Sequence, residues 1–176
     1  MSTLLYILLG IVLLIIILGM IAPKTYEVNR SIVVNKPLSE VFNYLKLLKN
    51  QEDWSPWAER DPNMKKTFSG TDGEVGFISA WESDHKQVGS GEQEIIGIDE
   101  NKEMRTQLRF LKPFKSQSDA YMRVADADGE TEVIWGFSGN NKFPMSIMML
   151  FMNMEKAIGG DFEQGLAKLK TTLENK

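Results

Sequence analysis

The sequence predicts an α+β domain in which a curved seven-stranded antiparallel sheet wraps around a long C-terminal helix, preceded by one transmembrane helix. Three observations lead to this fold class. The chain of 176 residues has no charged residue before Lys24. Short runs with strand-like alternation, separated by turn residues, fill the region 64–139. An apolar stripe with helical spacing then runs from Ile147 to Leu173.

The first segment has the length and composition of a membrane span. Between Thr3 and Ala22, 17 of 20 residues are apolar. Such a helix is about 30 Å long, which is the thickness of the hydrocarbon core of a bilayer. A cleaved signal peptide is the alternative, but the segment lacks a basic start and Met20–Ala22 is a poor cleavage site. We therefore predict an uncleaved anchor over residues 1–23 that contacts the bilayer through residues 3–22.

The rest of the chain, residues 24–176, has the length of a single domain, because a chain of about 150 residues buries one core. Lys24 and Arg30 follow the span, and positive charge beside a span favours the cytoplasmic side of the membrane. We therefore expect a single-pass membrane protein whose domain is cytoplasmic.

The composition excludes several classes of function. The net charge of −4 provides no basic stripe, which argues against a nucleic acid partner. Without cysteine and with a single histidine, His85, the chain lacks the residues for disulfides, thiolate catalysis and cysteine or multi-histidine metal sites. We expect neither a metal nor a cofactor, and the composition names no protein partner.

The domain is expected to begin with an extended stretch over Tyr26–Val34. Pro37 then suits the first turn of a helix, and Val41, Phe42 and Leu45 recur at helical spacing. These residues predict a short amphipathic helix after the first strand.

The region 64–139 predicts a meander of strands, because Gly, Asp, Asn and Pro separate its apolar runs. The six expected strands are Met64–Ser69, Gly76–Trp81, Val88–Ile98, Met104–Leu111, Gln117–Ala125 and Thr131–Gly139. Successive side chains of a strand point to opposite faces, so alternate residues share the inner face. The expected inner sets are Phe77, Ser79 and Trp81; Gln93 and Ile95; Met104, Thr106, Leu108 and Phe110; Ala120, Met122 and Val124; and Thr131, Val133, Trp135 and Phe137.

A single continuous helix is expected to close the chain over 147–173, where apolar residues step by three or four. Gly159, Gly160 and Gly165 lie inside it, although glycine disfavours a helix interior by about 1 kcal/mol. Close approach of the helix to the sheet explains these glycines better than catalysis does.

Residues 26–174 carry a series of short motifs in a fixed order. They are Val41-Phe42, Trp54-Ser55-Pro56-Trp57, Asp61-Pro62-x-Met64, Gly70, Gly76, Trp81, Val88-Gly89-Ser90-Gly91, Lys112-Pro113-Phe114, Thr131-x-Val133-x-Trp135 and Ile158-Gly159-x-Asp161-Phe162-x-x-Gly165-Leu166-x-x-Leu169-Lys170. In this order they resemble the SRPBCC superfamily, and within it the polyketide cyclase/dehydrase-like, START-like branch. The resemblance implies a helix-grip fold with an apolar cavity between the sheet and the long helix. An N-terminal anchor occurs on such relatives, and the resemblance does not imply cyclase activity.

The expected cavity suits a hydrophobic small molecule or lipid, because aromatic rings line such pockets and methionine adapts to varied ligands. The candidate ligand-binding residues are Trp54, Trp57, Phe77, Trp81, Gln93, Leu108, Phe110, Trp135, Met148 and Met152. Two alternatives stay open at this point. The tryptophans can fill the barrel, and the methionines of the segment 145–154 can be core residues or contacts to the bilayer.

The sequence shows no catalytic constellation. Glu92 and Glu94 share one face of a predicted strand and are candidates for an acid–base pair, with a solvated outer face as the alternative. His85 is a third candidate, but it lies in a predicted turn, where an exposed histidine without a chemical role is common.

These observations lead to a membrane-tethered domain that binds a hydrophobic small molecule or lipid between the sheet and the C-terminal helix. A cyclase or dehydratase that uses the same cavity is one alternative. A membrane-localised interaction module without a ligand is the other.

Overall fold

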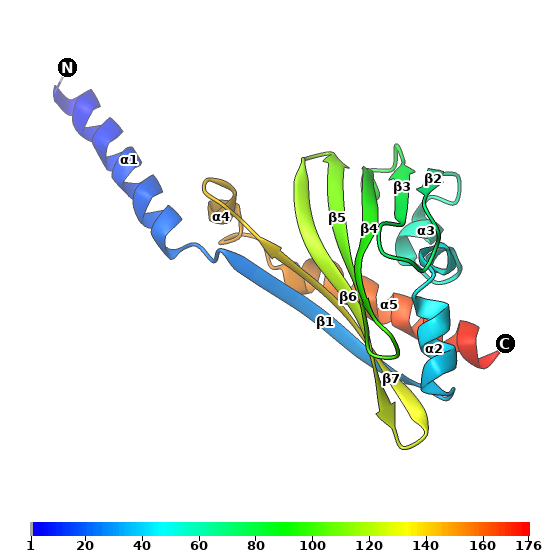
Figure 1. Cartoon of the computed structure of the whole chain (residues 1–176). Coiled ribbons are helices and arrows are strands. Elements are labelled where there is room, and N and C mark those ends of the chain that lie inside the picture. The colour runs from blue at the N-terminus through cyan, green and yellow to red at the C-terminus, as the bar shows by residue number, and fades with distance from the viewer. Residues whose placement is uncertain (1) are drawn as a thin grey trace.

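The computed structural model describes residues 2–176, so Met1 of the predicted anchor lies outside the described residues. The first helix, α1 (Ser2–Ile21), extends away from the rest of the chain and leads directly into β1 (Thr25–Val34), as Figure 1 shows. Its stretch Thr3–Ile21 is exposed and is long and apolar enough to cross a membrane, a property shared by anchors and signal sequences.

The seven predicted strands form one antiparallel sheet with the order β1-β7-β6-β5-β4-β3-β2. The remaining strands are β2 (Lys65–Ser69), β3 (Ile78–Glu82), β4 (Ser90–Asp99), β5 (Glu103–Lys112), β6 (Ser116–Ala127) and β7 (Glu130–Asn140). Each begins within two residues of its predicted start. The meander β2 to β7 pairs neighbours in the chain, as turns between short runs predict, and β1 pairs with its last strand.

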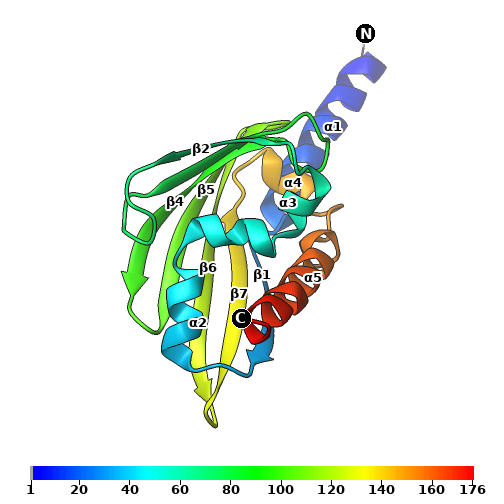
Figure 2. The same ribbon diagram turned by 90° about the vertical axis from the view of Figure 1, so that its right-hand side faces the viewer.

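Helices cover one face of this sheet. They are α2 (Leu38–Leu45), the 3₁₀ helix η1 (Leu48–Asp53), α3 (Pro56–Arg60) and α5 (Met154–Glu174). In Figure 2, α5 lies along the concave face beside β1, and α2 crosses in front of β6. The predicted α+β helix-grip fold is confirmed, since the curved sheet encloses a long C-terminal helix.

The prediction of one unbroken C-terminal helix over 147–173 is wrong. A short helix, α4 (Met145–Met148), precedes α5, and the two are separated at residues 149–153. The break has a local cause, because the Asn153 side chain accepts a hydrogen bond of 3.1 Å from the backbone N–H of Lys156 and so caps a new helix. Apolar spacing alone does not reveal such a cap.

Of the three α5 glycines predicted to allow close approach to the sheet, Gly165 meets a ring on a strand, whereas Gly159 meets the flexible end of the Arg30 side chain. A Cβ atom on Gly159 would stand 2.4 Å from Arg30 Nη2, and one on Gly165 would stand 2.8 Å from the Trp135 ring. A methyl group fits at neither position without displacing its neighbour. By contrast, Gly160 faces open space.

Candidate functional site

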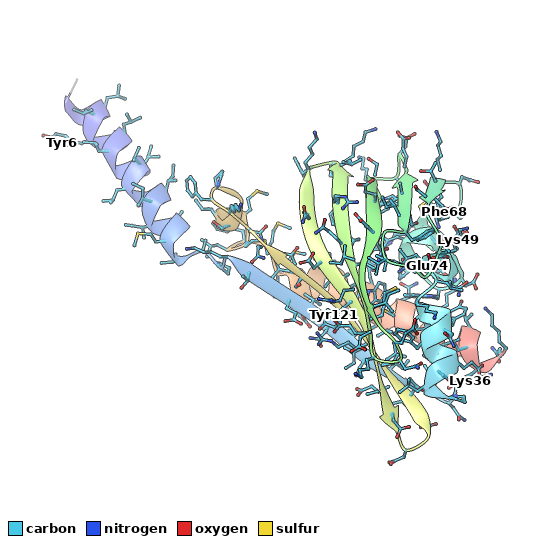
Figure 3. All side chains as sticks on the ribbon, viewed as in Figure 1. Tyr6, Lys36, Lys49, Phe68, Glu74 and Tyr121 are labelled. Carbon is cyan, nitrogen blue, oxygen red and sulfur yellow. The ribbon has the colours of Figure 1, made fainter. Side chains whose placement is uncertain are left out.

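The concave face of the sheet has two different ends. At the packed end, far from α1, side chains of α2, α5 and the strands fill the interior. The residues of this packed core are Val34, Phe42, Met104, Met122, Val133, Leu166 and Leu169, all at most 4% exposed. In Figure 3, Lys36 marks this side of the molecule. The hollow end, near the start of β1 and of α5, encloses a cavity instead.

The cavity has a volume of about 450 Å³. Its lining is apolar for the most part, with Leu48, Trp57, Ala58, Met64, Trp81, Val88, Leu108, Phe110, Pro113, Phe114, Ala120, Trp135, Phe137, Met154, Ile158 and Phe162. The polar lining residues are Tyr26, Gln51, Glu52, Ser55, Lys66, Ser79, Lys86, Gln87, Gln93, Lys112, Ser116 and Ser118. Such a volume is typical of small-molecule pockets, which range over about 300–1,000 Å³.

The central strand β6 explains why only one end is hollow. Its inward residues at the packed end are Met122 and Val124, both buried, whereas Ser118 and Ala120 take the corresponding positions at the hollow end. Small side chains in the middle of a curved sheet form the floor of a space that the larger neighbouring side chains do not fill. The hollow therefore follows from the change in side-chain size along one face of β6.

Aromatic rings from four strands surround this floor. The Phe110 centroid lies 6.1 Å from that of Trp81 and 6.5 Å from that of Phe137, both in edge-to-face geometry. Tyr26 follows, with its centroid 5.7 Å from Phe137. Edge-to-face pairs hold the rings in fixed orientations, so they form a firm apolar wall.

At the inner limit of the cavity, the tryptophans close the space. The Trp135 and Phe162 rings stack with centroids 4.1 Å apart, and Trp54 meets Trp135 edge-on at 5.0 Å. Trp57 packs edge-on against the same Trp135 ring at 5.8 Å. These rings separate the cavity from the packed end.

A few neutral polar groups face the cavity. Tyr26 Oη and Ser118 Oγ lie 3.0 Å apart, within hydrogen-bond distance, and Gln93 Nε2 donates to Thr106 Oγ1 at 3.0 Å. Burial raises the pKa of Tyr26, an effect that its bond to Ser118 only partly opposes. The phenol therefore stays protonated at neutral pH and offers a hydrogen bond without a charge.

Three of the charged lining residues, Glu52, Lys66 and Lys112, have ionic partners. Lys66 Nζ lies 3.1 Å from Glu52 Oε1, and Lys112 Nζ lies 3.7 Å from Glu82 Oε1. Partial exposure screens such pairs, so they contribute little to the field inside the hollow.

The candidate acid–base residues do not line the cavity. Arg109 binds both carboxylates, with Glu92 Oε1 at 2.5 Å from its Nε and Glu94 Oε2 at 2.7 Å from its Nη1. Gln93, between them, points inward, so the two glutamates lie on the outer face of β4. His85 is exposed in the turn after β3, where its Nδ1 accepts a hydrogen bond from the Gln87 N–H at 3.3 Å.

The structure brings six of the ten candidate ligand-binding residues to the cavity: Trp57, Trp81, Gln93, Leu108, Phe110 and Trp135. Trp54 and Phe77 are each 1% exposed and belong to the core. Met148 and Met152 are each 48% exposed on the surface near α1, because the break before α5 turns their segment away from the sheet. Ligand contact by any of these residues remains a prediction.

Sequence reasoning missed several lining residues. For Tyr26 the sequence predicts only an extended stretch. Ser116 and Ser118 are small residues of one parity on an interior strand, and this pattern is a signal of free volume. Phe114 depends on the position of a hairpin. Met154 belongs to the methionine segment 145–154 that the sequence associates with the cavity, and its place in the lining depends on where α5 starts. Strand parity identifies a face, but it does not locate loops in space.

The chain belongs to the family described as polyketide cyclase/dehydrase and lipid transport, whose model matches residues 25–174. No curated protein matches the chain.

Solved structures share the fold. Protein MLL2253 from Mesorhizobium loti has a TM-score of 0.59 at 18% identity, with 86% of this chain and 98% of that chain covered. A protein from Rhizobium leguminosarum has a TM-score of 0.61 at 13% identity over 87% of this chain and 97% of that chain. The di-domain ARO/CYC StfQ, from the steffimycin biosynthetic pathway, has a TM-score of 0.62 at 8% identity over 86% of this chain and 51% of that chain. At these identities the likeness concerns the fold.

Proposed function

We propose that this protein binds a hydrophobic small molecule or lipid in the cavity between the sheet and the start of α5. The observation that carries the proposal is the hollow of about 450 Å³ above the small residues Ser118 and Ala120. Transfer of apolar surface from water into such a space is favourable by about 25 cal/mol per Å². The neutral donors Tyr26 and Gln93 would orient a polar group of the ligand.

We further propose that α1 anchors the domain to a bilayer. The exposed apolar helix supports this, since about 20 uncharged residues insert readily. A tether keeps the cavity at high local concentration beside the phase into which a hydrophobic ligand partitions.

The two alternative functions have less support. A cyclase or dehydratase needs an acid or base within hydrogen-bond reach of its substrate, and Glu92, Glu94 and His85 lie outside the cavity lining. An interaction module without a ligand would have a filled interior, whereas the volume here exceeds the lower limit of about 300 Å³ for ligand pockets. Binding is therefore the function that the geometry favours.

The test is native mass spectrometry of the full chain, purified in mild detergent from its host membranes. The matched variants are Ser118→Phe, which fills the hollow, and Gln117→Phe, which places the same ring on the exposed outer face of β6. We expect a bound hydrophobic molecule in the wild type and in Gln117→Phe. Its occupancy should fall by about tenfold or more in Ser118→Phe, at unchanged circular dichroism. Unliganded wild-type protein, or equal occupancy in both variants, would contradict the proposal.

A further inference from the structure

An uncharged apolar segment lies on the surface beside α1. No acidic or basic residue occurs in the range 143–154, between Lys142 and Glu155. Within it, Phe151 is 80% exposed and Phe143 is 61% exposed, and Met148 and Met152 are also exposed. Several large apolar side chains exposed within one short segment indicate a surface that meets an apolar partner.

The position of this segment identifies the partner. Phe143 packs on the last turns of α1, since a Cβ atom on Gly19 would stand 2.9 Å from Phe143 Cδ2. Figure 1 shows α4 beside the junction of α1 and β1. A side chain that touches Gly19 lies at the depth at which a spanning helix leaves the hydrocarbon core.

A groove lies between this surface and the cavity. It has a volume of about 420 Å³ and lies between residues 23–28, directly after α1, and residues 149–155. Tyr26 and Met154 line both the groove and the cavity, so these two side chains form the partition between them. The groove is thus continuous with the surface that carries Phe151.

The charges around the segment fit the same arrangement. Lys142 directly precedes the segment, and Lys24 lies next to its start, because the Asn141 N–H donates to the Lys24 carbonyl at 2.7 Å; basic side chains suit lipid headgroups there. The acidic residue at its end, Glu155, is held by Arg30, with Oε1 2.5 Å from Nη1. The acidic border residue is thus paired with a cation on β1.

We propose that the segment Phe143–Met152 inserts into the headgroup region of the bilayer that α1 spans, so that the groove at Tyr26 and Met154 opens onto lipid. A hydrophobic ligand then passes between bilayer and cavity without crossing bulk water. The insertion rests on the proposed anchoring by α1, and the transfer route rests on the proposed ligand binding.

Site-specific labelling tests the insertion, and the absence of cysteine from the chain makes each label unique. Phe151→Cys and Val75→Cys, each carrying a nitrobenzoxadiazole dye, are compared in the full chain reconstituted into phosphatidylcholine and phosphatidylglycerol vesicles. Val75 is the matched control because it is an apolar residue, 63% exposed, in the loop that contains Glu74, on the side of the molecule away from α1 in Figure 3.

We expect the label at position 151 to be quenched by spin-labelled lipids and protected from aqueous iodide, with the reverse at position 75. Iodide quenching of equal strength at both positions would overturn the insertion. Protection from iodide without quenching by lipid would also overturn it, because the surface would then be covered by protein.

The transfer route is tested with Phe151→Asp and Val75→Asp. A fluorescent fatty acid serves as the probe, added in vesicles and, separately, in detergent. We expect Phe151→Asp to slow uptake from vesicles several-fold while affinity in detergent stays equal to that of Val75→Asp. Equal uptake rates would overturn the route, whereas loss of binding in detergent for the wild type would count against the proposed function and leave the labelling result standing.

Discussion

The packed end and the hollow end of this domain are built from the same seven strands and the same helix, yet only one of them is filled. Along the inner face of β5, Met104 and Thr106 are buried, while Leu108 and Phe110 are half-buried. Along α5, Leu166 and Leu169 are buried, while Met154 and Ile158 face the cavity. Close packing and free volume are therefore separated along the length of the sheet.

The difference arises from what covers each end. At the packed end, α2 brings Val41, Phe42 and Leu45 over the sheet, and all three are buried. At the hollow end, the helix that the apolar pattern predicts is interrupted, and the segment before Asn153 leaves the concave face. The inner face of the strands there remains partly uncovered.

The largest expected effect on the free energy of unfolding comes from replacing a leucine with alanine, and it should differ between the two ends. Leu166→Ala at the packed end should lower the free energy of unfolding by about 2–5 kcal/mol, since the buried side chain leaves a void among close-packed neighbours. Leu108→Ala should cost about 1 kcal/mol, because its side chain already faces a hollow. Urea unfolding of the full chain in detergent, followed by tryptophan fluorescence, measures both. Equal losses would mean that the ends are packed alike.

A second pair compares two helix glycines. Gly165→Ala should lower the free energy of unfolding by about 1–3 kcal/mol, because the new methyl group meets the Trp135 ring. Gly160→Ala should raise it by up to about 1 kcal/mol, since its site is open and alanine favours a helix. Thermal unfolding ranks the two variants. Stabilisation by both would show that α5 does not lie close to the sheet at Gly165.

The smallest expected effect concerns pH at the hollow end. Burial raises the pKa of Tyr26, so the folded state keeps its proton at pH values where the unfolded state loses it, above about 10. The stabilisation is complete below that pH and is lost as the pH rises through the folded pKa. Tyr26→Phe should therefore lose less stability than wild type between pH 9 and pH 11, as measured by urea unfolding at each pH. Parallel losses would indicate that the phenol is solvated.

The sequence was sufficient to predict which residues face the interior of the sheet, because alternation within each run determines which residues share a face. Met104, Thr106, Met122 and Val133 are inward and buried, as parity predicted. Five of the six candidate residues that line the cavity follow from the same alternation, whereas the sixth, Trp57, lies in the helix α3. The break before α5 could not be predicted from periodicity. It depends on a side-chain cap at Asn153 and on the outward path of the segment before that residue.

The aromatic residues show why composition alone could not separate core from cavity. Trp54 and Trp57 stand three residues apart, yet one is 1% exposed in the core and the other lines the hollow. Both pack edge-on against Trp135. Which of them borders free space depends on the small residues opposite, on β6, and these are informative only once the strand order is known.

The comparison of the two ends is tested most directly by adding the same three heavy atoms to each. Ala120→Leu extends a side chain into the hollow, and Gly165→Val extends one into the packed contact between α5 and Trp135. Measured by urea unfolding of the full chain, Ala120→Leu should change the free energy of unfolding by less than about 1 kcal/mol, while Gly165→Val should lower it by about 3 kcal/mol. A loss for Ala120→Leu as large as that for Gly165→Val would contradict a hollow at this end of the sheet.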